Sequence, residues 1–127
     1  MRLRSYTAFV GLLLITSCNV LPTSCTLIGC TSGVNVTFSR QPAAPYRVEA
    51  LVEGSAPVVF ECSNASSCTG VGAVFLAVEA EEMTIRVTTP SGTVTQQVRP
   101  QYEPMYPNGR RCGPVCEQAN VTIQFPD

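Results

Sequence analysis

Hydrophobic and polar residues alternate along most of the chain after residue 33, which is the pattern of strands with one buried face. In one such segment Met83, Ile85 and Val87 are separated by Thr84 and Arg86. No segment has the apolar spacing of an amphipathic helix. The pattern predicts seven strands, at residues 34–38, 46–52, 58–62, 74–78, 83–88, 93–99 and 121–125.

Turn-forming residues separate these strands. Pro90, Ser91 and Gly92 predict a tight turn that pairs the flanking strands as a hairpin, and the segment 64–72 predicts a loop. Seven short strands in about a hundred residues favour one all-β domain, a small antiparallel β-sandwich of immunoglobulin-like or transthyretin-like type. A small barrel is the alternative.

The N-terminus has the parts of a signal peptide. Arg2 and Arg4 supply positive charge, and residues 8–15 form an unbroken apolar run. This run is far shorter than the roughly 20 residues of a transmembrane helix. Residues 14–18, L-I-T-S-C, resemble the lipobox of bacterial lipoproteins, in which an aliphatic, a tolerant and a small position precede the cysteine that accepts a diacylglyceryl group.

The resemblance implies that residues 1–17 are removed and that Cys18 carries acyl chains, palmitate among them. Several chains anchor a protein stably, whereas one gives marginal binding. The mature protein would then be held in the cell envelope. In a Gram-negative cell the outer membrane is preferred, because Asn19 is not the aspartate that signals inner-membrane retention in some of these bacteria. The alternative is an ordinary leader cut near Ser17 or Ser24, which gives a soluble secreted or periplasmic protein. We expect residues 18–32 to be a lipidated tether with a disulfide-pinned approach to the domain, and residues 33–127 to be the sandwich.

Charge and composition argue against several classes of function. The eight basic residues are all arginine, and loss of Arg2 and Arg4 leaves six against nine acidic residues. This balance argues against nucleic-acid binding, which requires a basic surface. The chain has no histidine, which removes the commonest catalytic base and, with the cysteine spacing, argues against zinc. We expect no enzyme activity, catalytic residue, metal or small-molecule cofactor.

The chain has seven cysteines, an odd number. If Cys18 carries lipid, six remain, and in an exported protein these predict three disulfides. Cys62 ends one strand and Cys68 lies in the loop after it, so we expect a local bridge between them.

The other four cysteines form two spaced pairs, Cys25 with Cys30 and Cys112 with Cys116. The first and last strands of many sandwiches are parallel neighbours. We therefore expect Cys25 and Cys30 to cross to Cys112 and Cys116, with local bridges inside each pair as the alternative. The run C-G-P-V-C at 112–116 also resembles the C-G-P-C site of thioredoxin-like oxidoreductases, but with three intervening residues instead of two.

Residues 100–111 contain three prolines, two tyrosines and two adjacent arginines. Stiff loops with such side chains are favoured contact surfaces. They predict a partner-binding loop formed by Tyr102, Met105, Tyr106, Arg110 and Arg111. The alternative is that a tyrosine covers one end of the core and the arginines are solvated.

Glu79, Glu81 and Glu82 are the densest acidic cluster. They predict a solvated hairpin turn between two strands, and a Ca²⁺ site or a carboxylate pair is the alternative.

The chain thus resembles small, cysteine-stapled lipoproteins of the bacterial envelope. The resemblance implies a non-enzymatic binding or structural module at the membrane, with an envelope protein or a glycan as partner. Two alternatives are an inhibitor of a hydrolase such as lysozyme and a thiol oxidoreductase that uses Cys112 and Cys116.

Overall fold

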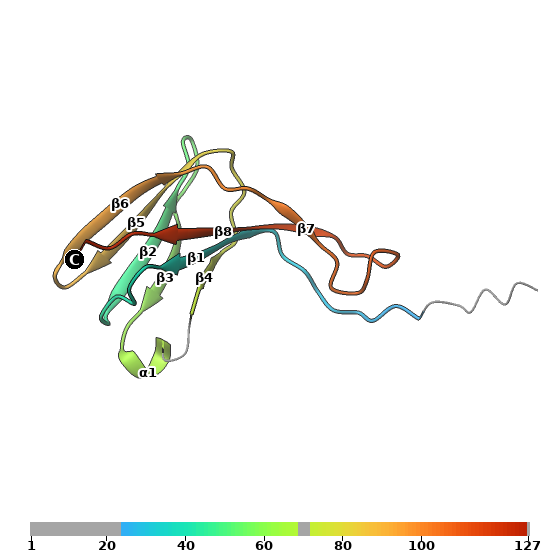
Figure 1. Cartoon of the computed structure of the whole chain (residues 1–127), viewed down its shortest axis with the longest axis horizontal. Coiled ribbons are helices and arrows are strands. Elements are labelled where there is room, and N and C mark those ends of the chain that lie inside the picture. Colours follow the sequence, from blue (N-terminus) through green and yellow to red (C-terminus); the bar gives the residue numbers. More distant parts are fainter. Residues whose placement is uncertain (1–23, 69–71, 127) are drawn as a thin grey trace, which may run out of the picture.

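The structure is a computed structural model that describes residues 24–68 and 72–126. In this part of the chain two four-stranded sheets pack on each other (Figure 1). The elements are β1 Gly33–Phe38, β2 Tyr46–Leu51, β3 Val58–Cys62, α1 Ala65–Cys68, β4 Val74–Leu76, β5 Met83–Thr89, β6 Gly92–Val98, β7 Glu103–Met105 and β8 Cys116–Ile123.

The first sheet has the order β4-β1-β8-β7 and the second the order β3-β2-β5-β6. Strands β1 and β8 run parallel in a register that extends from Gly33 opposite Gln118 to Phe38 opposite Ile123. Every other strand pair is antiparallel, including the hairpin of β5 and β6. The predicted small β-sandwich and its parallel first and last strands are therefore confirmed.

The core lies between the sheets and is made by the apolar half of each alternating strand. Val34 and Val36 of β1 face Val48 of β2 and Ile85 of β5, and all four are fully buried. Among the described residues no polar or charged side chain is buried. Hydrophobic burial therefore dominates the packing of the two sheets.

The acidic segment 79–82 does not form the predicted hairpin turn. Strand β4 pairs with β1 in the first sheet, whereas β5 belongs to the second, so the segment crosses from one sheet to the other. The alternation of β4 and β5 predicts that each has a buried face, but it does not specify which sheet contains it.

Three further features differ from the prediction. Strand β7 lies inside the expected loop 100–111, and β8 begins at Cys116, well before residue 121. The one-turn helix α1 occupies part of the predicted loop 64–72. Within the described residues, no helix has both the length and the apolar character needed to cross a membrane.

Candidate functional site

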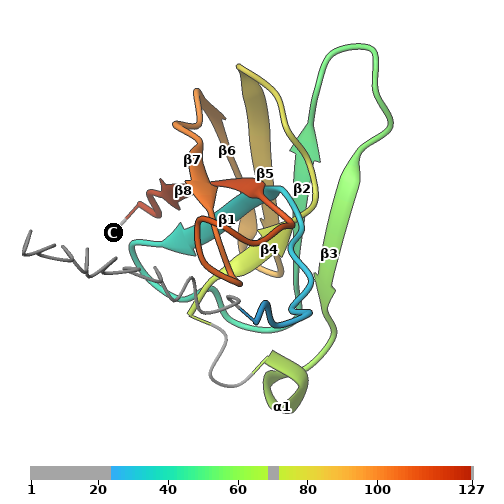
Figure 2. The same ribbon diagram turned by 90° about the vertical axis from the view of Figure 1, so that its right-hand side faces the viewer.

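Two segments that are far apart in the sequence project together from one end of the sandwich (Figure 1). They are residues 25–32, which lead into β1, and residues 105–116, which run from the last residue of β7 to the first residue of β8. We call these two segments the arm. Figure 2 shows the same arm end-on, in front of the strands.

Two disulfides hold the arm together. Cys25 is bonded to Cys112 and Cys30 to Cys116, with Cα–Cα distances of 5.6 and 5.7 Å. The predicted crossing is thus confirmed, as is the local bridge between Cys62 and Cys68. Cys112 and Cys116 are buried and are bonded to the N-terminal segment instead of to each other. They do not form the mutual disulfide that a thioredoxin-like site requires.

Asn108 joins the two segments of the arm between the disulfides. Its Nδ2 donates to the carbonyl oxygens of Ile28 and Gly113, both at 2.9 Å. Its Oδ1 accepts from the backbone N–H of Ile28 at 3.0 Å and from the hydroxyl of Thr26. Sequence reasoning missed this residue, because an Asn-Gly pair signals only a turn.

Four of the five predicted loop residues lie on the arm. Met105 is exposed at the end of β7, and Arg110 and Arg111 are exposed in the connection. The guanidinium carbon of Arg110 lies 5.1 Å from the centroid of the Tyr106 ring, which is a cation–π contact. Leu27, Ile28 and Val115, which the prediction did not include, are exposed beside them on the same arm.

Tyr102 lies apart from the other four predicted residues. Its ring packs against the core. Its hydroxyl accepts a hydrogen bond from the backbone N–H of Ala80 at 3.0 Å and donates to the carbonyl of Ala80 at 3.2 Å. Tyr102 therefore links the segment 79–82, which crosses between the sheets, to the residues just before β7.

Replacing Tyr102 with phenylalanine removes both hydrogen bonds and is expected to lower the free energy of unfolding by about 1–2 kcal/mol. Denaturant unfolding followed by circular dichroism measures the change. Tyr106→Phe is the matched control, because no hydrogen bond of its hydroxyl is found among the described residues, and it should change stability by less than about 0.5 kcal/mol. Equal effects of the two variants would show that the Ala80 contacts do not matter.

The acidic segment has its strongest contacts at Glu82. The Glu82 carboxylate lies 2.7 Å from Nε of Arg99 and also accepts a hydrogen bond from the side-chain amide of Gln97. Gln97 lies near the end of β6 and Arg99 directly after it, and this end of β6 pairs with the start of β5. Glu79 and Glu81 are exposed. Within residues 24–68 and 72–126, no group of three or more histidine, cysteine or acidic side chains is placed to hold a metal ion.

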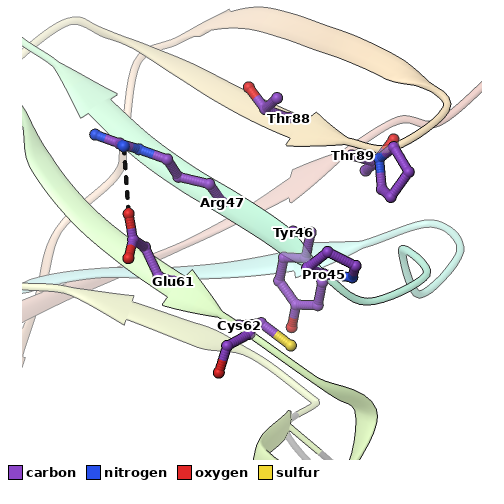
Figure 3. Close-up of a pocket in the computed structure, with 9 residues that line it drawn as sticks. Pro45, Tyr46, Arg47, Glu61, Cys62, Thr88 and Thr89 are labelled. Carbon is purple, nitrogen blue, oxygen red and sulfur yellow. Dashed lines mark ion pairs between the residues drawn. The ribbon is translucent and has the colours of Figure 1, made fainter.

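A shallow pocket of about 350 Å³ lies on the second sheet, where β2 begins and β3 and β5 end (Figure 3). Arg47 at its edge is paired with Glu61 at 3.2 Å and with Glu49 at 3.1 Å, so its charge is already compensated. The other lining side chains are mainly prolines and threonines with Tyr46. The pocket therefore offers an open, mostly apolar surface without an uncompensated charge.

The fold and the cysteine pairing define a small, disulfide-linked β-sandwich protein of an oxidising, extracytoplasmic compartment. Comparison of the chain with known protein families, curated proteins and solved structures finds no match.

Proposed function

We propose that the chain is a lipid-anchored protein of the bacterial cell envelope and that its β-sandwich is a non-enzymatic module which makes contact through the arm. The observation that carries the proposal is the use of the cysteines. Three disulfides take up six of the seven, and the cysteine that none of them involves is Cys18, at the end of the lipobox-like sequence. Cys18 lies outside the residues that the structure describes.

The arm supports the role of a contact module. Its backbone is held by two disulfides and by Asn108, while its exposed side chains include both apolar groups and arginines. A rigid surface loses little conformational entropy on binding. By contrast, the charged residues on the second sheet pair with each other, as in the contacts of Glu49 with Arg47 and Arg86.

The intact mass of the protein purified from the membrane fraction of its native host tests this proposal. The expected mass is that of residues 18–127 plus acyl chains, with six thiols reacting only after reduction, because the three disulfides are closed in the folded protein. Cys18→Ser should abolish both the acyl mass and the removal of residues 1–17. Thr16→Ala, at the tolerant position of the lipobox, is the matched control and should keep both. An unacylated chain cut near Ser17 or Ser24 would instead identify a soluble secreted protein.

A further inference from the structure

Most of the exposed large apolar residues in the described part of the chain belong to the arm. Among the described residues, six large hydrophobic side chains are at least about two-fifths exposed. Four of them belong to the arm, namely Leu27 at 99%, Ile28 and Val115 at 55% each and Met105 at 46%. Val59 and Phe75, at 39% and 38%, lie on strands of two different sheets. Such a concentration of apolar surface marks a site that contacts another molecule or a membrane.

The arm also differs from the rest of the chain in charge. It contains Arg110 and Arg111 and no acidic residue, so its formal charge is +2. After residue 17, the rest of the chain has the other four arginines and all nine acidic residues, a formal charge of −5. A negatively charged surface would therefore attract the arm and repel the sandwich behind it.

The position of the arm matches the proposed anchor. Cys18 precedes Cys25 by seven residues, and an extended chain of that length spans at most about 25 Å. Cys25 is bonded to Cys112 inside the arm. Lipid on Cys18 would thus keep the arm close to the bilayer, while the turn between β5 and β6 lies at the opposite end of the molecule (Figure 1).

These three observations point to one ligand class. We propose that the arm docks on the anionic phospholipid surface in which the lipid anchor is embedded. Its apolar side chains enter the interface between headgroups and acyl chains, and its arginines bind lipid phosphates. The inference rests on the proposed function for the closeness of the arm to a membrane.

A tryptophan probe tests the docking, because the chain has no tryptophan of its own. Leu27→Trp places one on the arm, and Val59→Trp, on the exposed side of β3, is the matched control. Both are made in the Cys18→Ser chain, exported behind a conventional cleaved leader so that no lipid is attached. With phosphatidylglycerol vesicles, emission of the Leu27→Trp variant should shift to shorter wavelength and be quenched by brominated lipid. Emission of the Val59→Trp variant should not change.

The charge of the arm is tested by co-sedimentation of the same Cys18→Ser chain with these vesicles. Arg110→Gln with Arg111→Gln should weaken binding about fivefold for each arginine at low salt. Arg40→Gln with Arg99→Gln removes the same charge from the sandwich and should change binding less than twofold. Pure phosphatidylcholine vesicles should bind the unaltered arm more weakly than phosphatidylglycerol vesicles.

Three results with vesicles would overturn the inference. The first is an unchanged emission of the Leu27→Trp variant at millimolar phosphatidylglycerol. The second is equal quenching of the Leu27→Trp and Val59→Trp variants by brominated lipid. The third is an equal loss of vesicle binding in the two double-arginine variants. Capture of an envelope protein by the arm without vesicle binding would also overturn the inference, because the arm would then bind a protein and not a membrane. Since the probe chain carries no lipid, these outcomes do not depend on the native mass. An unacylated native protein with positive vesicle results would contradict the proposed anchor alone.

Discussion

Replacing all four cysteines of the arm with alanine is expected to lower the free energy of unfolding by about 7 kcal/mol, whereas loss of either disulfide alone should cost about 3 kcal/mol. The reason is the size of the loops. The bonds join residues 87 and 86 positions apart, so the first one to form closes a very long loop, worth about 4.5 kcal/mol in the chain-entropy treatment. With one bond in place, the second closes a ring of only about ten residues and adds about 3 kcal/mol.

The loss from both bonds should therefore exceed the sum of the two single losses. Denaturant unfolding of the two single-bond variants and the four-alanine variant measures this difference. Domains of this kind have total stabilities of about 5–15 kcal/mol, so the four-alanine variant should lose about half of its stability or more. Cys62→Ala with Cys68→Ala is the control, because its loop spans 6 positions and predicts a loss of about 2 kcal/mol. A four-alanine variant no less stable than a single-bond variant would show that the arm does not hold the chain ends.

Gly33→Ala is expected to lower the free energy of unfolding by about 3 kcal/mol, because β1 and β4 approach each other too closely at Gly33 for a side chain. A Cβ atom there would lie 2.3 Å from the carbonyl oxygen of Leu76 and 2.7 Å from the ring of Phe75. The oxygen belongs to the backbone of the paired strand, so relief requires the two strands to separate.

Thermal and denaturant unfolding measure this effect. Gly29→Ala is the matched control, because a Cβ atom at that position meets nothing within 4 Å. It should leave stability within about 0.5 kcal/mol of the unaltered protein. A similar loss from both variants would indicate a general effect of glycine replacement and would contradict the specific contact of β1 with β4.

The strands were predictable from sequence wherever one face is apolar over several residues. Met83, Ile85 and Val87 illustrate this, because each is buried on the core side of β5 as the alternation predicts. The crossed disulfides were also predictable, since parallel first and last strands bring their starting ends together. The strand prediction rests on a short-range pattern, and the disulfide prediction rests on a general property of sandwiches.

Strand β7 was not predictable, because Pro104 in its centre argues against a strand. A proline lacks the N–H of a ladder hydrogen bond and is tolerated only at an edge, and β7 is an edge strand of the first sheet. The start of β8 was missed for a different reason. Residues 116–120 are largely polar, and their partners come from the distant N-terminal segment, where Ser32 accepts from the N–H of Glu117 and Thr31 from the side chain of Gln118.

The composition of the arm was only half predictable. Met105 and the two arginines were predicted as contact residues because they lie in a proline-rich segment. Leu27 and Ile28 were not, because the sequence predicted residues 18–32 to be a tether. Only the disulfides and Asn108 show that the two segments form one surface. Tyr102 carries the same sequence signal as Tyr106, and its backbone partner Ala80 lies 22 residues away. Contacts at such separations leave no local pattern.

The parallel pairing of β1 and β8 has a mechanical consequence. Because Cys25 is bonded to Cys112, ahead of β8, and Cys30 to Cys116, the first residue of β8, a pulling force on the chain at Ser24 reaches the beginnings of both strands together. The two strands are then loaded in the same direction, so the register between them is not sheared. Rupture requires both strands to slide out of the core as a pair, past β4 on one side and β7 on the other. The two disulfides thus make a pull on the N-terminal segment act on two neighbouring strands instead of on β1 alone.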